Sequence, residues 1–419
     1  MTRLAVIAMS VAAAVLLAGC TAPAPLPTPT PTPSATARPT GDGVLRIGTL
    51  LPMSGDVAFI GPAMVAAVEI AVRDVNSAGG VLGQPVEVVY RDSGDTSQDR
   101  LETAFAELVE RGVDVIIGPA TSALAERLLP LAAEADIAVI SPAATYPTTG
   151  SAALQGVFFR TIPAYDRQAG AIVRELADQG AESVALVTTG DALGFSFELS
   201  VRAALEREGM RLKSIEQLDG ATNVERLAFS VASGEPDAVI LATGASLAAQ
   251  NQALIAALIK RGVRAEQLWL TAQNLADYSA TVEARLLEGA QGVLEGADVD
   301  DELVTRLRQS DPALLSFRYA PETYDAVVLA ALAAVLANDD SGRSIAAFLQ
   351  QAAAQGVPCS SFGECLDVLD TEPAVDYQGL SGPLTLDEVG DVIDGELGLY
   401  QYTAENRPER VGTLSIAAR

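Results

Sequence analysis

The stretch VLRIGTLLPMSGDVAFIGPAMVAAVEIAVRDVNSAGGVLGQPVEVVYRD (44–92) decides the fold of this chain. Residues 44–51 form an apolar run typical of a buried strand, and residues 61–78 carry apolar side chains at helical spacing. Gly79 and Gly80 tolerate the left-handed conformation that ends a helix, and PVEVVYRD (85–92) is expected to form a second strand. A strand, a helix and a strand in this order predict a βαβ unit with parallel strands.

The same alternation continues along the chain and starts again near Pro163. The remaining strands are expected at 113–118, 137–141, 183–189, 211–217, 237–243 and 267–271. The remaining helices are expected at 96–111, 122–135, 165–179, 195–208, 223–233 and 246–261. Short apolar strands that alternate with helices predict the α/β class, here as two Rossmann-like lobes whose parallel sheets are covered on both faces.

The N-terminus predicts export and a lipid anchor. Arg3 precedes an apolar run, residues 4–18, that has the length of a secretory signal and is short for a membrane span. The run ends in Leu-Ala-Gly-Cys (17–20), which resembles a bacterial lipobox and implies cleavage after residue 19 and lipidation of Cys20. An ordinary signal peptide with a chance cysteine is the alternative. Residues 20–43 then form a linker rich in Pro and Thr, which favours an extended spacer and leaves O-glycosylation open.

Composition excludes several classes of function. Asp and Glu total 54 against 27 for Lys and Arg, so the net charge of −27 disfavours a nucleic-acid partner. The chain has no histidine, which excludes imidazole catalysis and His-based zinc sites. The only lysines, Lys213 and Lys260, do not complete a P-loop. We therefore expect neither a cofactor nor a metal.

The remaining cysteines, Cys359 and Cys365, lie close together in CSSFGEC. Export makes their compartment permissive for disulfides, so we expect a bond between them, with two free thiols as the alternative.

Loops after the predicted strands are the places to search for a ligand site, because open parallel sheets bind ligands beyond the carboxyl ends of their strands. In GPATSA (118–123), Thr121 or Ser122 can cap the following helix or donate a hydroxyl to an anion. SPAAT (141–145) adds backbone groups and the Thr145 hydroxyl. Side by side, the two loops offer the donors and acceptors that the carboxylate and ammonium of an amino acid require.

The chain also resembles the extracytoplasmic solute-binding proteins of ABC importers, in particular the leucine/isoleucine/valine-binding family with the type I periplasmic binding fold. The resemblance covers nearly all of 44–416. The stretches that carry it are IGTLLPMSGDVAFIG (47–61), AVEIAVRDVNSAGGVLGQPVEVVYRDSGD (67–95), LVERGVDVIIGPATSA (108–123), AVISPAATYPTTG (138–150), VFFRTIPAYDRQAGAI (157–172), YDAVVLAALAAV (324–335) and LSGPLTLDEVGD (380–391).

That resemblance implies two lobes joined by three crossing segments, near Pro163, Gly296 and Leu397, with a ligand cleft between the lobes. Lobe 1 would comprise 44–163 and 298–396, and lobe 2 would comprise 164–297 and 397–419. Family members close over a small ligand by a hinge motion and then dock on membrane permease subunits.

The resemblance also implies roles for single residues. Ser122, Ala143 and Thr145 match the positions that hold an amino-acid headgroup. The turn that contains Ile60 contributes where the family often has Tyr, and Tyr319 matches an aromatic residue that packs on the ligand side chain.

Lobe 2 departs from the family pattern. Leu193 and Gly244 stand at tyrosine positions, and Ala272 stands where an acidic residue pairs with the ligand ammonium. An unpaired buried ammonium is costly. Either a nearby polar group takes over, or the ligand has no α-ammonium. The candidates to take over are Gln273, Asn274, Asp277 and Asp56.

The expected function is a lipid-anchored binding protein outside the cytoplasm. We expect a monomer that captures a small polar solute, an amino acid or a related carboxylate or amide, and delivers it to ABC permease subunits without catalysis. A sensor of the same fold that signals to a membrane partner is the alternative. A secreted hydrolase is a third reading, in which paired acids such as Asp191 with Asp219, or Asp298 with Asp300, would act.

Overall fold

The first large sheet has five parallel strands in the order β2-β1-β3-β4-β5 in the computed structural model, which describes residues 40–146, 156–353 and 356–417. Its strands are β1 (Arg46–Leu51), β2 (Glu87–Asp92), β3 (Val115–Ile117), β4 (Ala138–Ser141) and β5 (Phe158–Arg160). The helices between them are α1 (Gly61–Ser77), α2 (Leu101–Glu110) and α3 (Ser122–Glu134). The signal peptide, Cys20 and the linker up to residue 39 lie outside the described residues.

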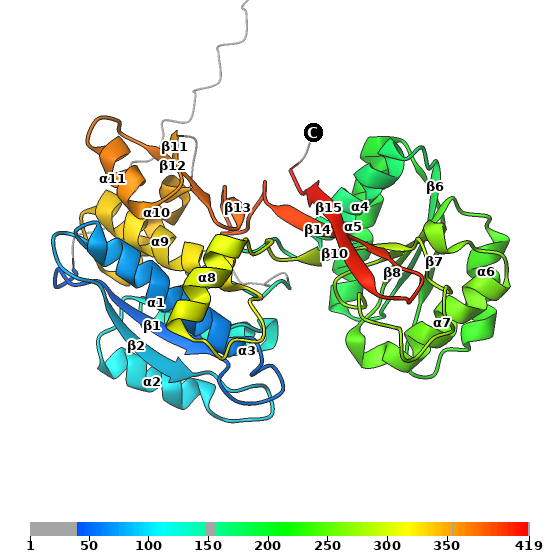
Figure 1. Cartoon of the computed structure of the whole chain (residues 1–419), viewed down its shortest axis with the longest axis horizontal. Helices are drawn as coiled ribbons and strands as arrows, with labels where there is room; N and C mark the ends of the chain where they lie inside the picture. The colour runs from blue at the N-terminus through cyan, green and yellow to red at the C-terminus, as the bar shows by residue number, and fades with distance from the viewer. Residues whose placement is uncertain (1–39, 147–155, 354–355, 418–419) are drawn as a thin grey trace, which may run out of the picture. The chain divides into compact units, whose positions relative to one another are not determined.

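Alternating side chains explain why helices cover both faces of this sheet (Figure 1). Successive residues of a strand point to opposite faces. Ile47 and Leu51 of β1 belong to the core that includes α1, whereas Leu50 belongs to a separate core with residues of α2 and α3. Because both faces are buried, β1 reads in the sequence as a continuous apolar run.

The second large sheet has seven strands in the order β15-β14-β10-β9-β8-β6-β7. Its strands are β6 (Ser183–Thr188), β7 (Arg211–Gln217), β8 (Ala238–Ala242), β9 (Leu268–Leu270), β10 (Gln291–Glu295), β14 (Glu396–Tyr402) and β15 (Pro408–Ser415). Its helices are α4 (Arg167–Asp178), α5 (Ala192–Glu208), α6 (Val224–Ser233) and α7 (Ala248–Lys260). Two short 3-10 segments, Ala245–Leu247 and Ala265–Gln267, flank α7.

The strands predicted for the second sheet, β6 to β9, are parallel, but the sheet continues into β10, β14 and β15, which the sequence analysis did not predict. β14 pairs antiparallel with β10 and with β15, so the sheet is mixed. The connection from β14 to β15 spans only residues 403–407, and such a short turn joins antiparallel strands, whereas parallel strands need a long crossover.

Two helix starts lie three or more residues from the expected ones, and aspartates bind the backbone near both. Asp191 accepts the N–H of Gly194 at 2.8 Å and caps α5, which therefore begins three residues early. The carboxylate of Asp95 accepts the N–H of Ser97 at 2.8 Å and its hydroxyl at 2.6 Å. This Asx turn delays the start of α2 to Leu101.

The C-terminal part of the chain adds helices beside the first sheet and a small third sheet. The helices are α8 (Asp301–Ser310), α9 (Ala320–Ala337), α10 (Gly342–Ala352) and α11 (Phe362–Leu369). The small sheet contains β11 (Val357–Cys359), β12 (Val375–Gly379) and β13 (Gly382–Pro383). Among the described helices, α9 alone is long and apolar enough to cross a membrane, but 83% of it is buried inside the fold, as in the core helix of a soluble protein.

Three segments link the two large sheets: 161–166 before α4, 296–300 after β10, and 384–395 before β14. They contain or adjoin the three expected crossing points. All of them belong to one compact unit, residues 39–419. The division into two lobes at the expected boundaries stays a prediction.

Candidate functional site

Ser122 lies at the first turn of α3, directly after β3. Thr121 is the N-cap residue, but its hydroxyl makes no capping bond and has no hydrogen-bond partner among the described residues. Of the two roles considered for Thr121 and Ser122, the structure shows no side-chain cap, and donation of a hydroxyl to an anion stays a prediction. The hydroxyl oxygen of Ser122 instead accepts the N–H of Tyr146 at 3.1 Å, so it ties the loop after β3 to the loop after β4.

Ser141 at the end of β4 fixes the loop that carries Ala143 and Thr145. Its hydroxyl donates to the carbonyl of Pro119 at 2.7 Å and accepts the N–H of Ala144 at 2.9 Å. Ala143 and Thr145 are both buried, and no hydrogen bond of the Thr145 hydroxyl is described. Ser122, Ala143 and Thr145 therefore occupy two adjacent loops at one edge of the first sheet.

Arg160 on β5 binds the backbone of the loop after β4, and the sequence analysis did not identify it. Its side chain is fully buried, and one guanidinium nitrogen donates to the carbonyls of Ala144 at 3.0 Å and Tyr146 at 3.1 Å. Its Nε lies 2.6 Å from the carboxylate of Asp391, in the segment that leads to β14. A lone cation in the apolar strand FFR is the sequence signal that could have identified it.

Ile60 and Tyr319, the two other positions expected to contact the ligand, differ in their surroundings. Ile60 is buried in the hydrophobic core as the N-cap of α1; its N–H donates to the carbonyl of Val57 at 3.2 Å, and its carbonyl accepts the N–H of Met64 at 3.4 Å. Tyr319 precedes α9 with φ 64°, a left-handed conformation that costs a residue other than glycine about 1–2 kcal/mol. Its ring lies under the Arg318 guanidinium, 4.8 Å from the centroid, and burial raises its pKa to about 12. Strain held in this way is typical of functional positions.

The expected residues of the second sheet lie after β9 and at the start of α5. The side-chain oxygen of Gln273 accepts the hydroxyl of Tyr146 at 3.0 Å, so Gln273 contacts the loop that carries Thr145. Asn274 is buried and donates to the carbonyl of Leu241 at 3.0 Å and the hydroxyl of Thr243 at 2.9 Å. Its amide holds the end of β8, which is a structural role. Leu193 is half-buried against the core on α5.

The two aspartates considered as replacement acids both lie on the surface, and the carboxylate of Asp277 is already engaged. Asp277 is exposed, accepts the N–H of Ser279 at 2.8 Å and pairs with Arg407 at 3.5 Å. Asp56 is also exposed, and its N–H donates to the carboxylate of Asp95 at 2.9 Å. Neither carboxylate has a described interaction with Ser122 or Gln273.

A buried polar cluster that the sequence analysis missed adjoins these loops. Tyr165 is fully buried, and its hydroxyl is 2.9 Å from that of Thr271 at the end of β9. Gln168 donates to the carboxylate of Glu295 at 2.5 Å and accepts the N–H of Ala272 at 3.2 Å. Glu295 ends the otherwise uncharged strand QGVLE, a pattern that could have singled it out.

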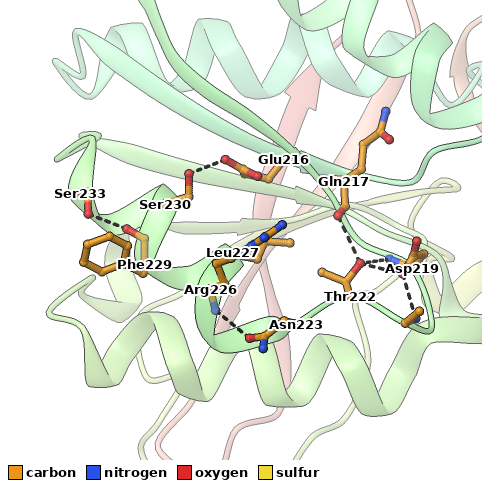
Figure 2. A pocket seen from close by; sticks show the side chains of 11 residues that line it. Glu216, Gln217, Asp219, Thr222, Asn223, Arg226, Leu227, Phe229, Ser230 and Ser233 are labelled. Carbon is orange, nitrogen blue, oxygen red and sulfur yellow. Dashed lines mark hydrogen bonds between the residues drawn. The ribbon is translucent and has the colours of Figure 1, made fainter.

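A cavity of about 800 Å³ lies elsewhere, between the edge strand β7 and α6 (Figure 2). Its lining includes Glu216, Asp219 and Arg226, and the Ser230 hydroxyl donates to Glu216 at 2.6 Å. None of the residues expected to bind a ligand lines it. It is therefore a second place to test, separate from the strand-end loops.

Comparison with known protein families matches residues 44–364 to the family described as periplasmic binding protein. The match covers most of the chain, and the two α/β sheets with their linking segments agree with it. The chain belongs to this family, and its fold is the type I periplasmic binding fold.

Individual relatives match this chain at low sequence identity and over only part of its length. A Leu/Ile/Val-binding protein of Rhizobium johnstonii is 28% identical over 168 residues, which cover 40% of this chain and 45% of the relative. The match thus spans about half the length of that relative.

Two solved structures share the fold. A substrate-binding protein of an ABC transporter from Desulfitobacterium hafniense, in complex with Leu, has a TM-score of 0.63 at 21% identity, covering 88% of this chain and 100% of that one. A solute-binding protein from R. palustris in complex with benzoate has a TM-score of 0.60 at 19% identity, covering 90% of this chain and 98% of that one.

Proposed function

We propose that this protein is a lipid-anchored receptor outside the cytoplasm that captures a small polar solute and delivers it to an ABC importer. The family supports solute binding, and the lipobox at Cys20 supports the anchor. The observation that carries the proposal is the junction of Ser122, Tyr146 and Gln273, because it joins strand-end loops of both large sheets through two hydrogen bonds. A solute held there would contact both sheets at once.

In this proposal, Ser122, Ala143 and Thr145 bind the polar headgroup of the solute. Hydroxyl and backbone donors at the start of α3 suit a carboxylate, since a helix N-terminus carries partial positive charge. Tyr319 and Leu193 would contact the remainder of the solute, and the backbone at Ile60 would close one side. Delivery to permease subunits and a monomeric state belong to the same proposal.

The alternative functions have less support. A sensor would use the same site, so it differs from an importer subunit only in the membrane partner. A hydrolase would need reactive acids, but Asp191 caps α5, Asp300 caps α8, and Asp219 accepts the N–H of Ala221 at 2.8 Å. Acids engaged in this way serve local structure, which favours a protein without catalysis.

The test is the double variant Ser122→Ala/Thr145→Ala, with calorimetry of amino acids and of benzoate. Loss of hydrogen bonds to a charged headgroup should weaken binding at least about tenfold. Apo stability should fall by only about 1 kcal/mol, since only the bond from Tyr146 to Ser122 is lost. In the wild type, solute at about 100 times its dissociation constant should add about 2.7 kcal/mol of stability.

The matched control is Thr222→Ala/Ser230→Ala, which removes two hydroxyls from the cavity in Figure 2. It should leave solute affinity unchanged. Wild-type affinity in the Ser122/Thr145 variant, together with weaker binding in the control, would move the site to that cavity.

A further inference from the structure

Glu295 is a buried acid at the end of β10. Its side chain is only 4% exposed, and one carboxylate oxygen accepts the amide of Gln168 at 2.5 Å. Across residues 40–146, 156–353 and 356–417, no ion pair to Glu295 is described. A buried carboxylate without a cation is costly until a positive group approaches it.

Gln168 connects this acid to the candidate site. Its nitrogen donates to Glu295, and its oxygen accepts the N–H of Ala272, the second residue after β9. The next residue, Gln273, bonds the hydroxyl of Tyr146. The carboxylate is thus one side chain away from the loop where the two sheets are joined.

Glu295 places negative charge near three tyrosines of the site. Burial and then the charge of Glu295 raise the pKa of Tyr146, and the same charge contributes to the raised pKa values of Tyr165 and Tyr319. Asp191 adds to this effect at Tyr146. Arg318 is the cation that attracts Glu295, yet burial still raises the pKa of Glu295 to about 7.

We propose that Glu295 is the counter-charge for an ammonium group on the bound solute, and that Gln168 is its positioning residue. The inference rests on the proposed function and narrows its substrate class to small solutes that carry an ammonium group, as amino acids do. A solute with a carboxylate alone, such as benzoate, would leave Glu295 without a partner.

A pH dependence follows from the same arrangement. The free protein binds a proton at Glu295 below about pH 7, and that proton must leave to solvent before the carboxylate can pair with an ammonium. Affinity for an ammonium solute should therefore fall as pH drops below about 7, with a limiting slope of about tenfold per pH unit. Tyr146, Tyr165 and Tyr319 stay neutral throughout this range because their pKa values are raised.

The experiment compares Glu295→Gln with the wild type, using the twenty amino acids, benzoate, and the matched pair L-leucine and 4-methylpentanoate, which is leucine without its amino group. The wild type should bind at least one amino acid, and it should bind 4-methylpentanoate and benzoate at least about tenfold more weakly. Glu295→Gln should lose at least about tenfold in affinity for that amino acid and should also lose the pH dependence.

Two further variants separate this role from a structural one. Glu322→Gln alters the other buried glutamate, whose carboxylate accepts the N–H of Ala297 at 2.5 Å, and should keep solute affinity. Gln168→Ala removes a bond that lowers the pKa of Glu295, so the midpoint of the pH dependence should move upward. If Glu295→Gln melts well below the wild type, its affinity cannot be interpreted. The test is then proton release by the wild type at about pH 7: binding of an amino acid should release a proton from Glu295.

The possible contrary results distinguish a failure of the Glu295 proposal from a failure of the proposed function. Tighter binding of benzoate or 4-methylpentanoate than of any amino acid would overturn the role of Glu295 and leave the proposed function standing. The same holds for an amino-acid affinity that Glu295→Gln does not change. A wild type that binds none of the probes would contradict both proposals.

Discussion

Buried charged side chains in this fold differ in how many of their polar atoms have a hydrogen-bond or ion-pair partner. The buried carboxylate of Asp325 accepts the Tyr377 hydroxyl at 2.7 Å and the N–H groups of Leu380 and Ser381 at 2.9 and 2.7 Å. Arg160 has two carbonyls and one carboxylate. Glu322, only 1% exposed, has one oxygen on the N–H of Ala297, and its other oxygen has no described partner. Arg160 and Glu322 each keep a buried polar atom that has no hydrogen-bond partner among the described residues, whereas both oxygens of Asp325 accept hydrogen bonds.

Glu322 gives a prediction about stability and pH. Burial, with Asp325 adding repulsion, raises its pKa to about 7 from 4.5. A raised acid pKa gives stability that is present below about pH 4.5 and is lost as pH rises through about 7. Glu322→Gln should therefore be more stable than the wild type near pH 8, by on the order of 2 kcal/mol, with little difference near pH 5. Urea unfolding at both values measures this.

The control for that experiment is Glu110→Gln, an exposed acid at the end of α2. It should change stability by less than about 0.5 kcal/mol at either pH. A Glu322→Gln variant that is equally stable at both values, relative to the wild type, would show that Glu322 titrates normally in the folded protein.

Among the helices beside the first sheet, α9 is a buried core helix that contacts β3 and β4. Its 18 residues include an unbroken run of buried positions from Ala320 to Ala334, and it packs against α1 and α10. A helix that is apolar on all sides belongs in a core, and α9 begins directly after the strained Tyr319. Packing of α9 thus fixes where Tyr319 lies.

The bond between Cys359 and Cys365, which confirms the expected pairing, joins the end of β11 to α11. Between them, Ser361 caps α11 and Glu364 accepts the N–H of Ser360 at 2.8 Å. Closing so short a loop contributes about 2–2.5 kcal/mol in the chain-entropy account. Reduction of the wild type should lower its unfolding free energy by about that amount, as measured in denaturant with and without reductant.

Cys359→Ala/Cys365→Ala is the matched control for the reductant itself. This variant should start less stable and should not respond to reductant. If the reductant lowered the stability of both proteins equally, the effect would not come from this disulfide.

For the whole molecule, the first described residues show where the linker meets the folded part. The N–H groups of Gly41 and Gly43 donate to the carboxylates of Asp339 and Asp340, both at 3.0 Å. The chain therefore enters the fold beside the turn between α9 and α10.

Anchoring itself is testable in cells. Lipid chains contribute about 0.8 kcal/mol per buried methylene, so a lipidated Cys20 should keep the protein in the membrane fraction. Cys20→Ala should move it to the soluble or secreted fraction while leaving its melting temperature unchanged. Membrane retention of the Cys20→Ala protein would mean that another segment provides the anchor.

The sequence by itself determined the α/β class, most strand positions and the disulfide. These are local properties: apolar periodicity separates strands from helices, and two nearby cysteines in an exported chain can pair. It also indicated Ser122, Ala143 and Thr145 as adjacent, because the ends of neighbouring parallel strands meet at one edge of a sheet.

Only the tertiary structure decided the rest. The bond of Ser122 to Tyr146, the support from Arg160 and the contact of Glu295 with Gln168 join residues 24, 16 and 127 positions apart. The antiparallel edge formed by β14 and β15 also depends on pairing with the distant β10. No local pattern encodes such pairs, because burial and partner choice are properties of the packed chain, where each buried polar group must find whichever partner the fold brings to it.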